Sequence, residues 1–155
     1  MQSRKYLSIY LNDHLAALNA VRDVARRCRR SNEGTDLGDF LEEVIVDLDR
    51  AVAELESIAG RLGVRRDPLK RVAAWAAEKI GRLKLNGHLL SYSPLSRVLE
   101  IEGLIAGTDI ELSTWRALEA VLERDVTESV EACIRRREAL GRHHAEAVAV
   151  ALGGR

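Results

Sequence analysis

Two histidines and three carboxylates interrupt the apolar helix faces of this chain, and all five are of types that bind transition metals. They are His14, His144, Asp47, Glu54 and Glu102. Imidazole and carboxylate groups that converge inside a helical bundle suit Fe, Mn or Zn. One hypothesis is therefore a metal-binding bundle in which His14, Glu102 and His144, helped by Asp47 or Glu54, hold a single ion.

A buried ion pair is the alternative explanation for the same positions. Arg137 also takes a core position, so Glu102 and Arg137 would neutralise each other while the histidines bond to backbone or carboxylate groups. Each inward polar group needs such a partner, because an unpartnered one costs about 1–3 kcal/mol. No Glu is followed three residues later by a His, the pair that di-iron bundles place on two helices. We therefore favour a buried polar network without a cofactor.

A second group of residues gathers at one predicted helix–loop–helix corner. It consists of Lys79, Arg82, Lys84, Ser93 and Arg97. A helix amino terminus offers free N–H groups, so a phosphate or carboxylate could bind at this corner. A capped turn beside a solvated basic helix face explains the same residues, and we favour that interpretation because single corners of this kind are common.

No motif in the sequence identifies a reaction. The chain contains no GxSxG elbow, no glycine-rich phosphate loop and no CxxC pair, so hydrolase, nucleotide-binding and thiol-redox classes have no support. Arg26, Arg27, Arg29 and Arg30 form a basic helix end, but only 4% of residues are aromatic and could stack on bases. Lys plus Arg and Asp plus Glu both total 24, so no global charge attracts nucleic acid. The sequence thus disfavours nucleic-acid binding and favours a non-catalytic protein.

Spacings of three and four between apolar residues recur along the chain and predict helices that position these groups. The predicted helices cover residues 5–30, 36–62, 68–86 and 94–124, and a last one follows Asp125 and ends before the final GGR. The apolar seam of the first runs through Leu7, Leu11, His14, Leu18, Val21, Ala25 and Cys28. The seam of the second runs through Leu37, Leu41, Val44, Leu48, Val52, Leu55 and Leu62. Trp115 shares an arc with Leu118 and Leu122 and is expected in the core.

Prolines and glycines mark the predicted helix ends. Pro94 follows Ser93 in the order typical of a capped helix start, and Gly63 stands where a left-handed residue ends a helix. Gly107 is expected to break or kink the helix over 94–124, because Thr108 and Glu111 follow it with capping-box spacing.

Apolar faces that run along consecutive long helices must be buried against one another. We therefore predict one all-α domain over residues 1–155, an antiparallel four-helix bundle with an additional crossover helix at 68–86. Two distant cysteines and the lack of a signal peptide or membrane span favour a cytoplasmic protein. An ordered fold without catalytic motifs favours action through protein partners, including copies of the same chain.

Three stretches of the sequence carry a resemblance to known proteins. They are YLNDHLA at 10–16, AWAAEKIGRLKLNG at 74–87 and SPLSRVLEIEGL at 93–104. With the order of the helices, they make the chain similar to an uncharacterised bacterial family of ferritin-like helical-bundle proteins. The resemblance implies a ferritin-like bundle and no established activity. The chain departs from the ferritin-like metal pattern, since His14 stands where that pattern has a carboxylate.

Overall fold

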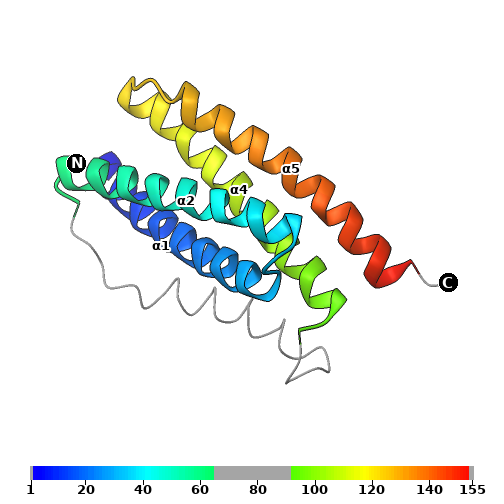
Figure 1. Ribbon diagram of the computed structural model, residues 1–155. Coiled ribbons are helices and arrows are strands. Elements are labelled where there is room, and N and C mark those ends of the chain that lie inside the picture. Colours follow the sequence, from blue (N-terminus) through cyan, green and yellow to red (C-terminus); the bar gives the residue numbers. More distant parts are fainter. Residues whose placement is uncertain (1, 65–91, 154–155) are drawn as a thin grey trace.

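Four long helices make up the part of the chain that the structure describes, residues 2–64 and 92–153 of a computed structural model (Figure 1). They are α1 (Gln2–Ser31), α2 (Asp36–Arg61), α4 (Pro94–Leu122) and α5 (Thr127–Leu152). Strands are absent from these residues, so the prediction of an all-helical protein is confirmed for them. The helix predicted at 68–86 lies outside the described residues.

The first two helices bury most of the apolar faces that their spacing predicts, while Leu7, Val21 and Leu62 are half-buried. The buried apolar residues of α2 are Leu37, Leu41, Val44, Leu48, Ala51, Val52, Leu55, Ile58 and Ala59. In α1, Leu15 is buried in the place that the predicted seam gave to His14, and His14 is only half-buried. A helix has 3.6 residues per turn, so Leu11, Leu15 and Leu18 stay on one face while His14 turns toward its edge.

The predicted helix ends are largely confirmed. Ser93 caps α4, where its hydroxyl accepts a hydrogen bond from the Ser96 backbone N–H while the Ser96 hydroxyl accepts one from the Ser93 N–H. Pro94 occupies the first turn, and Gly63 follows α2 with a φ of 64°. These contacts satisfy backbone groups that a helix end leaves without partners.

Side-chain contacts define how the helices lie against one another. Arg4 near the start of α1 donates to the carbonyl of Leu62 just after α2, while Arg29 near the end of α1 pairs with Glu42 near the start of α2. These pairs show that α1 and α2 run in opposite directions, as they do in Figure 1. In the same way α4 lies antiparallel to both α1 and α5, and α5 packs mainly along α4.

The predicted break at Gly107 is wrong, because α4 continues from Pro94 to Leu122. The glycine lies against Val21 of α1, and a Cβ built on it would come 2.3 Å from Val21 Cγ2. The close approach of two helices is therefore the physical reason for this glycine, and the capping-box spacing of Thr108 and Glu111 is coincidental.

Among the described residues, none of the helices has an apolar stretch that could cross a membrane.

Candidate functional site

Of the residues that could have formed a metal site, the structure brings His144 and Glu102 together. The Nε2 atom of His144 lies 3.0 Å from Glu102 Oε1, across the α4–α5 contact. Both groups are at the surface, since the Glu102 side chain is 51% exposed and the His144 side chain 30%. The prediction that Glu102 interrupts an inward face of its helix is therefore wrong.

The predicted pair of Glu102 and Arg137 does not form. Arg137 donates instead to Asp109 through an Nε–Oδ1 contact of 2.7 Å, with about half of each side chain exposed. The inward arginine is its neighbour Arg136, because the buried face of α5 runs through Cys133, Arg136, Leu140 and Ala147. A shift of one residue on a helix turns a side chain by about 100°, which takes Arg137 out of the core.

The other three predicted residues lie apart from that pair. His14 stacks on the ring of Tyr10, and its Nδ1 is 2.8 Å from the Tyr10 carbonyl oxygen. Asp47 lies 3.6 Å from Arg50 on its own helix, and Glu54 pairs with Arg124. Within residues 2–64 and 92–153, no three His, Cys, Asp or Glu side chains gather as a metal site requires.

Of the predicted anion corner, Ser93 and Arg97 lie among the described residues. Lys79, Arg82 and Lys84 lie outside the described residues. Ser93 is the cap of α4, so its hydroxyl is engaged with Ser96. Arg97 is half-buried on the first turn of α4, and its Nε has no hydrogen-bond partner.

The charged centre that sequence reasoning missed is a buried ion pair between α4 and α5. Arg136 Nη1 donates to Glu111 Oε2 at 2.6 Å, and the indole N–H of Trp115 donates to Glu111 Oε1 at 3.2 Å. The side chains of Arg136 and Glu111 are 4% and 3% exposed. Although burial opposes the charged form of Arg136, the Glu111 carboxylate outweighs it, and the pKa of Arg136 is raised.

This centre fixes the helices but offers no reactive group. Each Glu111 oxygen accepts a hydrogen bond, Arg136 stays charged, and both side chains are buried, so a substrate has no direct access to either group. The nearby Cys133 thiol stays neutral, because burial and then the Glu111 charge raise its pKa. A shift of α4 along α5 would separate Glu111 from Arg136 and leave two buried charges without partners. The ion pair therefore favours the observed register of these two helices.

The sequence did contain a signal for this centre. Buried residues of α4 follow each other at spacings of four and three through Leu104, Thr108, Glu111, Trp115 and Leu118. Glu111 thus lies in the middle of the inward face, which a purely apolar pattern does not reveal.

A second, partly buried polar cluster joins the end of α1 to the start of α4. Arg27 Nε donates to Glu100 Oε1 at 2.6 Å, and the Asn32 side-chain amide donates to the Tyr92 hydroxyl at 2.8 Å. Glu100 Oε2 and Asn32 Oδ1 are buried without a partner. Burial, aided by the Glu100 charge, raises the pKa of the Cys28 thiol to about 12. Cys28 is thus a neutral thiol with little nucleophilic character.

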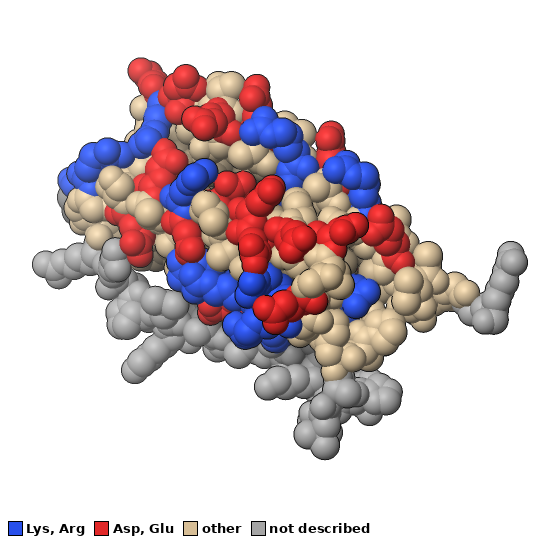
Figure 2. All heavy atoms as spheres, viewed as in Figure 1, with Lys and Arg blue, Asp and Glu red and all other residues tan. Residues whose placement is uncertain are grey.

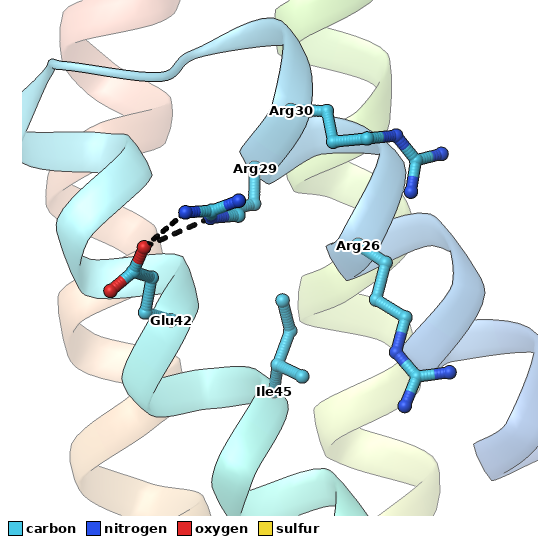
Figure 3. Close-up of a pocket in the computed structure, with 5 residues that line it drawn as sticks. All are labelled: Arg26, Arg29, Arg30, Glu42 and Ile45. Atoms are coloured by element: carbon cyan, nitrogen blue, oxygen red, sulfur yellow. Dashed lines mark hydrogen bonds and ion pairs between the residues drawn. The ribbon is translucent and has the colours of Figure 1, made fainter.

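On the surface, arginines gather over the second half of α1, beside a band of acidic side chains over α2 (Figure 2). Between the two helices lies a pocket of about 330 Å³, which we call the arginine pocket. It is lined by Arg26, Arg29, Arg30, Glu42 and Ile45 (Figure 3). Arg29 donates hydrogen bonds to the Glu42 carboxylate, and these bonds raise the pKa of the Arg29 guanidinium, which therefore stays charged. The pocket is therefore a basic concavity in a protein with no net charge.

Comparison with known proteins gives no assignment: no family model, no curated protein and no solved structure matches the chain.

Proposed function

We propose that this protein is a non-catalytic, ferritin-like helical bundle that acts through contacts with other proteins, first of all with copies of itself. The observation that carries the proposal is an apolar end of the bundle, which we define by Leu95, Val150 and Leu152. Their exposed fractions are 36%, 68% and 62%. Val150 and Leu152 leave α5 about 200° apart, so the three side chains share one end of the bundle and not a single helix face. Exposed apolar side chains at one end of a molecule are candidates for a contact site.

The three residues lie at one end of the molecule for a geometric reason. Glu102 and His144 are in contact, and α4 and α5 are antiparallel. Leu95 precedes Glu102 by about two helical turns and Leu152 follows His144 by about two turns, so they reach the same level. Figure 1 shows that α4 begins where α5 ends. The apolar end therefore combines exposed side chains of two helices, and a two-fold contact would bring this same end of two copies together.

The interior of the bundle supports a non-catalytic role. The buried carboxylates of the described residues are paired, Glu111 with the buried Arg136 and Glu100 with the half-buried Arg27, and both cysteines are buried neutral thiols. A general acid, a general base or a nucleophile needs a group whose protonation state can change near its working pH. These interior groups fit a structural role better.

The direction of the helices supports the ferritin-like part of the proposal. Glu54 near the end of α2 pairs with Arg124 just after α4, so these two helices end on the same side of the bundle. In ferritin-like bundles, helices with this relation are joined by a crossover connection. This arrangement agrees with the resemblance carried by residues 10–16, 74–87 and 93–104.

The test is the mass of the full chain by light scattering over a series of protein concentrations. We expect a dimer or higher oligomer, and we expect Val150→Ser with Leu152→Ser to weaken association by roughly a hundredfold or more, since four partly exposed apolar side chains leave the contact. Val121→Ser is the matched control, because Val121 is 61% exposed at the opposite end of α4. A monomer at every concentration, or an equal effect of the control, would refute the proposal.

A further inference from the structure

The arginine pocket has more positive charge than its own carboxylates neutralise. The described residues that line it contribute three guanidinium groups and one carboxylate, that of Glu42. Glu42 accepts hydrogen bonds from Arg29, while Arg26 shares Asp49 with Arg22 and lies 3.9 Å from Asp23. Arg30 is exposed and forms no ion pair or hydrogen bond within the described part of the chain. The pocket thus offers guanidinium groups to an additional anion.

The floor of the pocket is apolar. Ile45 of α2 is half-buried and packs against the core, and Figure 3 shows it between Arg29 on one side and Arg26 with Arg30 on the other. A free phosphate would use the charges and leave this isoleucine exposed. A ligand with an apolar group flanked by acidic groups would use both.

The spacing of the arginines specifies the ligand further. Arg26 and Arg30 are four residues apart, so their side chains start from neighbouring positions on one face of α1. Guanidinium groups bind carboxylates through paired, charge-assisted hydrogen bonds, as Arg29 already does with Glu42. Carboxylates at the same four-residue spacing on a partner helix would match this pair of arginines. Among the described residues that line the pocket, none has an aromatic side chain on which a nucleic-acid base could stack.

From these observations we propose that the arginine pocket docks an acidic amphipathic helix of a protein partner. Acidic residues four apart on that helix bind Arg26 and Arg30, and an apolar residue between them packs on Ile45. The pocket lies between α1 and α2 and the apolar end lies on α4 and α5, so this inference goes beyond the proposed self-association and can fail or succeed without it.

The experiment uses the full chain and a short, fluorescein-labelled, helix-forming peptide with glutamates four residues apart around a leucine, with binding measured by anisotropy. We expect Arg30→Ala to weaken binding about tenfold, the effect of one lost hydrogen-bonded charge contact, and Arg26→Ala with Arg30→Ala to weaken it further. Glu42→Gln should strengthen binding several-fold, by roughly the effect of one freed guanidinium, because Arg29 then lacks its competing carboxylate. This gain cannot come from misfolding.

The matched control is Arg116→Ala with Arg142→Ala, which removes the same charge from exposed positions of α4 and α5. It should leave peptide binding nearly unchanged. Equal loss in the control would assign the binding to net charge and overturn the proposal. So would equal binding of a peptide with serine in place of leucine, which indicates a simple anion site, or tighter binding of a single-stranded oligonucleotide, which indicates a nucleic-acid surface.

Discussion

Replacement of Arg136 by Met is the perturbation to which the fold should respond most strongly. In the native structure Glu111 accepts hydrogen bonds from Arg136 and from the Trp115 indole, and water does not reach it. Met fills a similar volume but has no charge. The variant therefore leaves the Glu111 carboxylate in the core with a single donor.

The structure indicates how large the effect should be. Removal of one partner from a buried ion pair costs about 3–5 kcal/mol, because the remaining charge stays desolvated. The adjacent pair of Arg137 and Asp109 is about half exposed, so Arg137→Met should cost less than about 1 kcal/mol. With a typical dependence of stability on urea, the two unfolding midpoints should differ by roughly 1 M or more.

The assay is urea unfolding of both variants, followed by circular dichroism for the helices and by tryptophan fluorescence. Glu111→Gln in the Arg136→Met background should recover part of the loss, since the neutral amide oxygen still accepts the Trp115 N–H. The same change in the wild-type background should destabilise, because it leaves the Arg136 cation without a counter-charge. Equal, small effects of Arg136→Met and Arg137→Met would refute the reasoning.

Three further predictions concern other parts of the bundle. Gly107→Ala should cost about 1–3 kcal/mol in urea unfolding, because its Cβ would meet Val21, and Val21→Ala in that background should restore part of the loss. Cys28 should resist thiol reagents until the protein unfolds, and stability should fall as pH rises from 9.0 toward about 12, since the unfolded thiol ionises first. The Asp125 carboxylate accepts the Thr127 backbone N–H, which lowers its pKa, so Asp125→Ala should lower the melting temperature at neutral pH but not well below pH 3.8. A pH-independent effect of Asp125→Ala would contradict that assignment.

The sequence was a good guide to α1 and α2 because the inward face of each is almost wholly apolar. Leu41, Val44, Leu48 and Leu55 recur with helical spacing, and all of them are buried. The Ser93 cap, the Gly63 turn and the buried Trp115 were also predictable, since each depends on local chemistry or on a single large side chain.

In α4 and α5 the apolar pattern was misleading because the buried faces are partly polar. The inward face of α4 contains Glu100, Thr108, Glu111 and Thr114, while Ala106 is exposed. Apolar spacing therefore indicated the wrong arc and placed Glu102 inside. Only the tertiary contact with Arg136 explains how Glu111 is buried, and the partner of a buried charge cannot be deduced from the spacing on its own helix.

The spacing of residues in the sequence could not predict the arginine pocket, for a different reason. Sequence alone showed basic residues at the end of a helix, which the helix dipole favours in any case. The position of Ile45 and Glu42 opposite Arg26, Arg29 and Arg30 depends on how α2 lies beside α1.

The most direct test of the central claim, that the protein acts through contacts between its own copies, is hydrogen exchange of the unmodified chain at low and high protein concentration. The last turns of α5, with Val150 and Leu152, should exchange more slowly at high concentration, because association covers them. The exposed region around Val121 should be unaffected. Identical exchange of the α5 end at every concentration would contradict the account.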